Sequence, residues 1–126
     1  MATVTATKDN FEQLVLENDT VFIDFWAEWC GPCRMFAPTF ESASEDHPDI
    51  VFAKVDTEDQ RELAEYFQIR SIPTLMVFKD QIAVFRQAGA LPAPVFGDLI
   101  GQVEDLDMEE VRAKIAAQDA DQEQAG

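Results

Sequence analysis

The chain has 126 residues, and its 25 acidic and 9 basic side chains give a formal net charge of −16 at pH 7. The length suits one domain with a sizeable core, and the charge argues against nucleic acid, whose phosphates it would repel. Two cysteines are too few for the disulfide framework of a secreted protein. The apolar runs are too short to span a membrane, and no signal peptide is visible. We therefore expect a cytoplasmic protein with no membrane partner.

Apolar patterning predicts an alternation of strands and helices along most of the chain. The expected elements are a short edge strand (4–6), a helix (8–17), a strand (21–26), a helix (32–45), a strand (50–55), a helix opening at 56–58, a strand (74–78), a strand (82–85) and a helix carrying residues 95–103. The strand over 21–26 is apolar on both faces except at Asp24, which favours the centre of a sheet covered on both sides. The order indicates an α/β fold with a mixed sheet, helices on both faces and a terminal hairpin.

Three local signals define how the first helices begin and run. Thr7 offers an N-cap for the first helix. Thr57 and Gln60 have the spacing of a capping box for the third helix. Pro38 lies inside the second helix, where it predicts a kink rather than a break and counts as structural support behind the cysteines.

The pattern changes in the last twenty or so residues, which are rich in acidic side chains. Asp107 and Glu110 favour a short extra helix. From Gln118 onward the composition is typical of a solvated tail. We therefore divide the chain into a domain at 1–106 and an acidic C-terminal extension at 107–126, with no internal repeat. The narrow apolar stripe of the extra helix consists of Met108, Val111 and Ile115.

The only two cysteines, Cys30 and Cys33, lie three residues apart between a predicted strand and a predicted helix. Disulfide exchange requires a thiolate, and a helix N-terminus favours an anion. Cys30 lies at or just before the first helical residue, so we expect it to attack. Cys33 lies one turn further on and begins the buried stripe, so we expect it to be shielded and to resolve. Their spacing is near what a disulfide requires.

Neighbouring residues fit the same redox interpretation. Pro32 suits the first turn of a helix because its missing N–H has no intrahelical partner there, and Gly31 removes bulk between the sulfurs. Asp24 on the central strand should have a raised pKa from desolvation and is the candidate proton acceptor for Cys33. Lys54 on the neighbouring strand could tune it. The alternatives are a surface carboxylate for Asp24 and a lysine that extends to solvent for Lys54.

A metal site is the other use of two close cysteines. One C-x-x-C motif supplies two ligands, whereas a structural zinc site generally needs four. The only histidine, His47, lies beside a proline and near no other ligand cluster. We therefore expect no metal at Cys30 and Cys33.

The stretch from Asp24 to Cys33 resembles the thioredoxin family, as do Ile72-Pro73-Thr74 and Gly89-Ala90-Leu91, with matching element order over about residues 4–106. The resemblance implies the thioredoxin fold, with sheet order 1-3-2-4-5, and a cis Pro73 that faces the sulfurs. Trp26 matches a tryptophan packed beneath the site, and Asp24 and Lys54 match a buried acid and its lysine neighbour. The positions that match the substrate groove are Trp29, Gly31, Pro32, Ile72, Pro73, Gly89 and Ala90.

The resemblance also implies how the site is used. It implies a redox-active disulfide between Cys30 and Cys33, with no bound cofactor, that NADPH reduces through thioredoxin reductase. The partners would be that reductase and client proteins with disulfides, and we expect a monomer. Three features depart from the family pattern: Asp80-Gln81 at the hairpin turn, Ser71 before Ile72, and the extension.

Three functions follow as hypotheses. The first is a general protein disulfide reductase, in which Cys30 attacks a client disulfide and Cys33 resolves the mixed disulfide. The second is a disulfide oxidase or isomerase on the same fold. The third is a non-catalytic binding subunit, since a fold does not fix a function.

Overall fold

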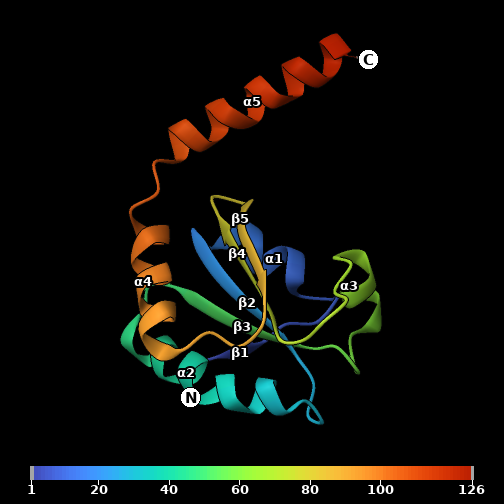
Figure 1. Ribbon diagram of the computed structural model, residues 1–126, viewed down its shortest axis with the longest axis vertical. Coiled ribbons are helices and arrows are strands. Elements are labelled where there is room, and N and C mark those ends of the chain that lie inside the picture. The colour runs from blue at the N-terminus through green and yellow to red at the C-terminus, as the bar shows by residue number, and fades with distance from the viewer. Residues whose placement is uncertain (1, 126) are drawn as a thin grey trace.

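The computed structural model describes residues 2–125, and its elements follow the predicted order (Figure 1). The strands are β1 (Val4–Thr5), β2 (Thr20–Trp26), β3 (Val51–Asp56), β4 (Thr74–Lys79) and β5 (Ile82–Ala88). The helices are α1 (Phe11–Glu17), α2 (Gly31–Asp46), α3 (Arg61–Tyr66), α4 (Ala93–Glu104) and α5 (Met108–Ala125).

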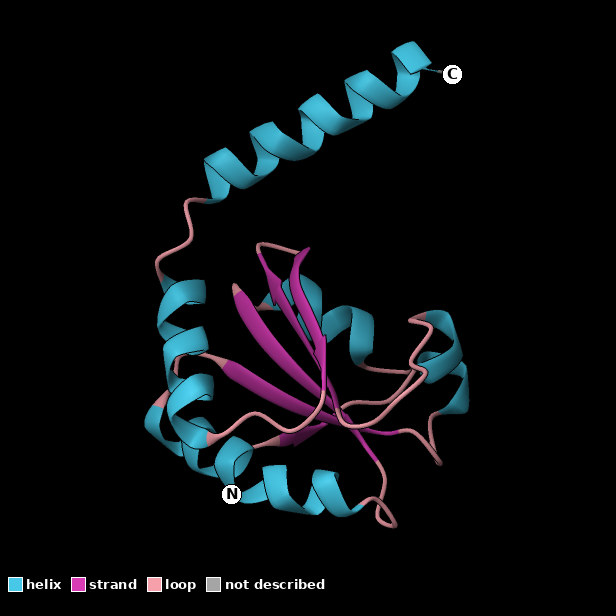
Figure 2. Ribbon diagram, in the orientation of Figure 1, coloured by secondary structure: helices cyan, strands magenta, loops and turns pink. Residues whose placement is uncertain are grey.

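The five strands form one mixed sheet in the order β1-β3-β2-β4-β5, which confirms the expected fold. Strand β3 pairs with β1 and β2 in parallel, and β4 pairs with β2 and β5 in antiparallel. Strand β2 is therefore central, as its apolar character on both faces predicts. Figure 2 shows helices on either side of the sheet.

Two hydrophobic cores cover the two faces of the sheet. On one face, Phe22 of β2 packs with residues of α2 and α4, among them Phe40 and Phe96. On the other face, Ile23 of β2 packs with residues of α1 and α3. Because side chains alternate along a strand, Asp24 points to the same face as Phe22. The buried carboxylate therefore lies on the face that α2 covers.

The first helix begins later than the sequence predicts. Helix α1 starts at Phe11 with Asn10 in the N-cap position, and a turn occupies residues 8–10. The Thr7 backbone N–H donates to Asn10 Oδ1 at 2.7 Å, and the Thr7 hydroxyl accepts from the Asp9 N–H at 3.3 Å. Thr7 is therefore a turn residue, and the prediction that it caps the helix is wrong.

The predicted capping box of the third helix is also wrong. Helix α3 starts at Arg61, and no side-chain hydrogen bond caps it at Gln60. Thr57 instead donates its hydroxyl to the Trp26 carbonyl oxygen at 3.0 Å. The side chain that was expected to cap the helix is used to tie the end of β3 to the end of β2.

Helix α2 continues through Pro38 without a break, as predicted. The larger difference lies in the extension, where helix α5 runs to Ala125 and so includes the segment predicted as a tail. Figure 1 shows α5 projecting away from the sheet beyond α4. No helix in the described range is both long enough and apolar enough to cross a membrane.

The junction between α4 and α5 is held by one lysine from the sheet. Lys79 Nζ donates to the carbonyl oxygens of Val103, Glu104 and Leu106 at 2.6, 3.0 and 3.5 Å. These carbonyls belong to the last turn of α4 and the residues after it, where a helix leaves acceptors unsatisfied and favours a cation. The start of α5 is therefore fixed to the hairpin end of the sheet.

The β4–β5 turn contains two residues with a left-handed backbone. Asp80 and Gln81 have φ angles of 51° and 70°. Positive φ at both central positions is the pattern of a two-residue type I′ turn, which favours glycine at its second position. The turn type is therefore unchanged although glycine is absent, and Gln81 adopts a backbone conformation that costs free energy for a residue with a side chain.

Replacing Gln81 by glycine should stabilise the protein by about 1 kcal/mol, because glycine adopts positive φ without a steric penalty. Urea unfolding of the Gln81→Gly variant measures this change. Gln81→Ala is the matched control, since both variants lose the hydrogen bond from Gln81 Nε2 to the Leu16 carbonyl. A glycine variant no more stable than the alanine variant would show that the turn is not strained.

Candidate active site

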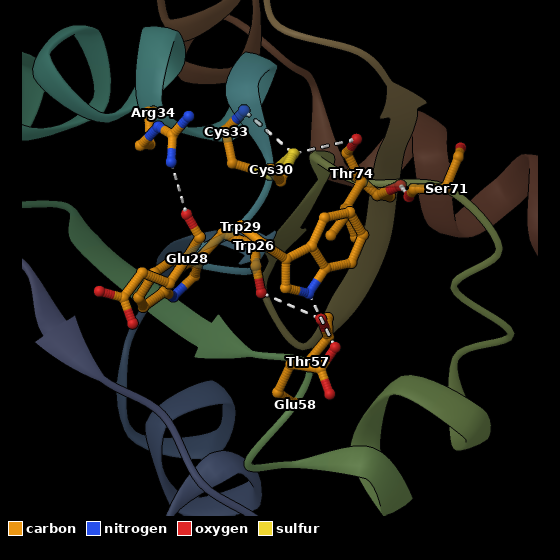
Figure 3. The surroundings of a disulfide bond; sticks show 11 residues. Trp26, Glu28, Trp29, Cys30, Cys33, Arg34, Thr57, Glu58, Ser71 and Thr74 are labelled. Atoms are coloured by element: carbon orange, nitrogen blue, oxygen red, sulfur yellow. Dashed lines mark hydrogen bonds between the residues drawn. A yellow bond between two sulfur atoms is a disulfide. The ribbon is translucent and has the colours of Figure 1, made fainter.

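Cys30 and Cys33 form a disulfide at the start of α2 (Figure 3). Helix α2 begins at Gly31, so Cys30 occupies the N-cap and Pro32 lies in the first turn. The Cα atoms of the two cysteines are 5.2 Å apart, within the range of protein disulfides. The pairing implied by the family resemblance is confirmed.

The sulfur of Cys30 takes the place of an N-cap oxygen. The Cys33 backbone N–H donates to Cys30 Sγ at 3.2 Å, and this sulfur lies 3.6 Å from the carbonyl oxygen of Ile72. The first N–H groups of a helix have no intrahelical partner, so a sulfur at this position meets a donor and the positive end of the helix dipole. The arrangement favours a thiolate on Cys30 once the disulfide is reduced.

Burial of the whole residue does not separate the two cysteines. Cys30 is 3% exposed and Cys33 is 2% exposed, although the sequence suggested that Cys33 would be the more shielded residue. Both pack with Ala27, against Trp26 and Ile72. What distinguishes them is position, because only Cys30 has its sulfur at the end of the helix.

The loop before β4 passes directly beside the disulfide. The Ile72–Pro73 peptide bond is cis, as the resemblance implied. The Gly89 N–H donates to the Pro73 carbonyl oxygen at 2.8 Å, and Gly89 has a φ of +103°, which favours glycine. Two segments of the predicted groove are therefore joined by their backbones. Ser71, which departs from the family pattern, accepts a 2.6 Å hydrogen bond from the Thr74 hydroxyl through its carbonyl oxygen.

Trp29 forms an exposed apolar wall next to Cys30. Its side chain is 66% exposed, and its indole N–H donates to Glu58 Oε1 at 2.8 Å (Figure 3). Arg61 holds the other oxygen of Glu58 at 3.4 Å. Gly31 faces open space, since a Cβ there would meet nothing within 4 Å. Glycine at this position is therefore not needed to avoid an internal clash.

Glu58 is a residue of this site that was not predicted from the sequence. It lies 29 positions after Trp29, in the turn that follows β3. The available signal was topological, because parallel neighbouring strands end at the same edge of a sheet. The residues after β3 therefore had to lie near those after β2.

Asp24 is a buried carboxylate without a hydrogen-bond donor. It is 1% exposed, and neither of its oxygens has a hydrogen-bond partner among the described residues. Burial raises the pKa of Asp24 from 3.8 to about 7, and the positive charge of Lys54 offsets part of this rise. The alternative that Asp24 lies at the surface is wrong.

Lys54 lies next to Asp24 in the sheet. The two residues are register partners on β3 and β2, and Lys54 is half-buried. Its Nζ lies 4.8 Å from the centroid of the Trp26 ring, a cation–π arrangement. Trp26 in turn accepts hydrogen bonds from Thr57 through its carbonyl oxygen. Trp26 therefore contacts Lys54 through its ring and Thr57 through its backbone carbonyl oxygen.

The predicted groove residues lie on three segments, and the Ile72 carbonyl oxygen of the second segment lies 3.6 Å from Cys30 Sγ. Residues 29–32 lead into α2, residues 72–73 precede β4, and residues 89–90 follow β5. Pro38 is the exception among the named site residues, since it lies further along α2, beyond the first turn that carries Cys33. Within residues 2–121, whose side chains the structure describes, no group of three His, Cys, Asp or Glu side chains could hold a metal ion.

These features define a thiol–disulfide exchange site. A cysteine pair at a helix start forms a disulfide, a helix N–H contacts the first sulfur, and a buried acid lies on the adjoining strand.

The sequence matches the family described as Thioredoxin over residues 2–102. Putative thioredoxin 2 of Streptomyces coelicolor is 58% identical over 119 residues, which cover 94% of this chain and 89% of that protein. Thioredoxin 1 of Synechococcus elongatus is 45% identical over 95 residues, which cover 73% of this chain and 89% of that protein. The solved structure of Plasmodium falciparum thioredoxin has a TM-score of 0.74 and 35% identity, covering 79% of this chain and 98% of that one.

The chain belongs to the thioredoxin family. It is a disulfide oxidoreductase, and its chemistry is dithiol–disulfide exchange at Cys30 and Cys33.

Replacing Asp24 by asparagine should stabilise the oxidised protein more at pH 7.5 than at pH 4.5. The folded pKa of about 7 exceeds the unfolded value of 3.8, so the wild-type protein loses stability as pH rises between them. At about 1.4 kcal/mol per pKa unit, the full loss is of order 4 kcal/mol. Because asparagine does not ionise, the variant should not show this loss.

Urea unfolding at the two pH values measures the difference in the free energy of unfolding between Asp24→Asn and the wild type. The exposed Asp98 provides the matched control, since Asp98→Asn removes the same charge from the surface. An equal stabilisation of Asp24→Asn at both pH values would contradict a carboxylate destabilised by burial.

Proposed function

We propose that this protein is a general protein disulfide reductase. The observation that carries the proposal is the Cys33 N–H at 3.2 Å from Cys30 Sγ, because it favours a thiolate on Cys30 in the dithiol form. This thiolate attacks one sulfur of a client disulfide and forms a mixed disulfide. The other client sulfur leaves as a thiolate.

Cys33 then resolves the mixed disulfide. Its thiol gives a proton to the Asp24 carboxylate, whose pKa of about 7 suits proton transfer near neutrality. The Cys33 thiolate attacks Cys30 Sγ, the client leaves with its second sulfur reduced, and the Cys30–Cys33 disulfide forms. Two electrons pass to the client in all. Lys54 tunes Asp24 by favouring its ionised form.

The client binds as an extended segment across the groove defined by residues 29–32, 72–73 and 89–90. Its support is the exposed side chain of Trp29 on one side and the backbone of Ile72 on the other, with the Ile72 carbonyl 3.6 Å from the attacking sulfur. Pro32, Gly89 and Ala90 are also exposed. Apolar contact and backbone pairing, rather than a deep pocket, would then select clients broadly.

The dithiol is restored by a thioredoxin reductase that uses NADPH, with no cofactor bound to this chain. The protein acts as a monomer in the cytoplasm, where disulfides of client proteins are kept reduced. An oxidase or isomerase would use the same two sulfurs. A strongly oxidising reduction potential would favour that direction, and a strongly reducing potential would exclude it.

Reduction of insulin by NADPH and thioredoxin reductase, with this protein as the carrier, tests the proposal. We expect turnover by the wild type and a loss of at least a hundredfold in Cys30→Ser, because no thiolate remains at the helix start. Full turnover by Cys30→Ser, or none by the wild type, would refute the reductase. Turnover by the wild type would also distinguish a reductase from a non-catalytic binding subunit.

A trapping experiment assigns the order of the two cysteines. A Cys33→Ser variant should accumulate client proteins as mixed disulfides on Cys30, because the resolving thiol is missing. Cys30→Ser is the matched control and should trap few. If Cys30→Ser trapped clients as well as Cys33→Ser does, the roles assigned to the two sulfurs would be wrong.

A further inference from the structure

Arg86 connects strand β5 to the end of helix α3. Its guanidinium donates to the Phe67 carbonyl oxygen and, at 2.8 Å, to the Gln68 carbonyl oxygen. A guanidinium presents its N–H groups in a planar fork, so one side chain can hold two successive carbonyls in a fixed arrangement. Helix α3 ends at Tyr66, and the end of a helix leaves carbonyls without donors and favours a cation. Arg86 therefore fixes the backbone of the residues that follow α3.

The sheet directs the Arg86 side chain towards α3. Its register partner on β4 is Met76, which belongs to the core on the face that α1 and α3 cover. Register partners on antiparallel strands point to the same face of a sheet. Phe67 and Ile69 pack against that core with their side chains. The end of α3 is thus held to the sheet by apolar packing and by the hydrogen bonds of Arg86.

The backbone that Arg86 holds is a Schellman turn without glycine. The Gln68 N–H donates to the Glu65 carbonyl oxygen at 3.0 Å, and the Ile69 N–H donates to the Ala64 carbonyl oxygen at 2.9 Å. Gln68 has a φ of 54°, a left-handed conformation that costs free energy for any residue except glycine. The two hydrogen bonds from Arg86 therefore stabilise a turn that is costly on its own.

This turn leads to the backbone beside the attacking sulfur. A short loop joins Gln68 to Ile72, whose carbonyl oxygen lies 3.6 Å from Cys30 Sγ. Figure 3 shows Ser71 of this loop hydrogen-bonded to Thr74 next to the disulfide. A displacement of the turn after α3 would therefore move the backbone that lies against Cys30.

Strand β5 and the residue after it hold both ends of this loop. At one end the Arg86 side chain binds the carbonyls after α3, and at the other the Gly89 N–H donates to the Pro73 carbonyl oxygen at 2.8 Å. Between these anchors the loop borders a cavity of about 680 Å³, and both Arg70 and Ser71 are exposed. The course of the loop therefore depends on the anchors at its ends.

We propose that Arg86 is a positioning residue for client recognition. By fixing the turn after α3, it holds the Ile72 backbone where an extended client segment lies beside Cys30. This inference rests on the proposed reductase function and adds to it a residue that takes no part in the exchange itself. Arg86 should therefore affect clients that have a polypeptide backbone and leave the reactivity of Cys30 unchanged.

The rates at which the reduced, full-length protein reduces two different disulfides test this role. Insulin offers a polypeptide segment to the groove, whereas bis(2-hydroxyethyl) disulfide has no peptide backbone. We expect Arg86→Met to reduce insulin at least fivefold more slowly than the wild type and to reduce the small disulfide at an unchanged rate. An unchanged rate with insulin, or an equal loss with both disulfides, would overturn the proposal.

Arg112→Met is the matched control, because it removes the same charge from an ion pair with Asp80 at the hairpin turn. We expect wild-type rates with both disulfides in this control. A loss with insulin as large as that of Arg86→Met would attribute the effect to net charge and contradict positioning. Alkylation of Cys30 by iodoacetamide should proceed at the same rate in Arg86→Met as in the wild type, and slower alkylation would show that the variant changes the thiolate instead.

A second substitution tests whether Arg86 acts through the turn after α3. Gln68→Gly removes the cost of the left-handed backbone, so adding it to Arg86→Met should restore insulin reduction at least twofold. Gln68→Ala is its matched control, since alanine lacks the same side chain but keeps the cost, and it should restore nothing. Equal rates in the two double variants would overturn the assignment.

A milder variant covers the case in which Arg86→Met does not fold. Arg86→Gln keeps a shorter donor that cannot hold both carbonyls, and it should show the same selective loss with insulin. A wild-type rate with insulin in that variant would overturn the proposal. The two proposals fail on different results: no reduction of insulin by the wild type refutes the reductase, whereas equal rates in the wild type and Arg86→Met refute only the positioning role.

Discussion

One backbone hydrogen bond, from the Cys33 N–H to Cys30 Sγ, joins the fold to the chemistry. A helix that starts at Gly31 leaves N–H groups that need an acceptor. In this chain the acceptor is a sulfur rather than the hydroxyl or carboxylate that usually caps a helix. The same contact therefore gives a helix N–H group an acceptor and favours a thiolate on Cys30. The other parts of the site are arranged around this sulfur.

The position of that helix start depends on the sheet beneath it. Strand β2 ends at Trp26 and helix α2 begins at Gly31, so the cysteines lie directly beyond the central strand. Thr57 ties the end of β3 to Trp26, and Glu58 of the same turn holds Trp29. The turn after β3 thus fixes both tryptophans. Under the proposed function, its contacts help to shape the surface that a client meets.

Under the proposed mechanism, function and stability conflict at Asp24. A carboxylate without a hydrogen-bond donor in a buried position destabilises the folded protein when it ionises. A core residue of similar size and no charge would avoid this penalty. The same burial brings its pKa to about 7, where a carboxylate can accept and return a proton. The positive charge of Lys54, which is half-buried beside Asp24, lowers the free-energy cost of ionising Asp24.

Much of the fold and of the site could be predicted because it rests on local signals. The apolar runs identified the strands, and the resemblance supplied the sheet order and the cis Pro73. The spacing of Cys30 and Cys33 implied their proximity.

Contacts between distant segments could not be predicted from the sequence in the same way. Thr57 had the spacing of a helix cap, yet its hydroxyl binds a carbonyl 31 residues earlier in the chain. The sequence predicted the start of helix α5 but not its second half, because the composition of that half suits a helix or a solvated tail equally well. The contacts of Lys79 and Met108 that hold the start of α5 to the body depend on the tertiary structure of the hairpin end.

Alkylation of the reduced protein by iodoacetamide at pH 6.5 tests the central claim most directly. An ordinary cysteine is almost wholly protonated at this pH and reacts slowly. The helix start should keep a larger fraction of Cys30 as thiolate, so mass spectrometry should find Cys30 alkylated at least tenfold faster than Cys33. It should also react faster than the cysteines of the urea-unfolded chain. Equal, slow modification of both cysteines, folded and unfolded, would contradict an activated Cys30.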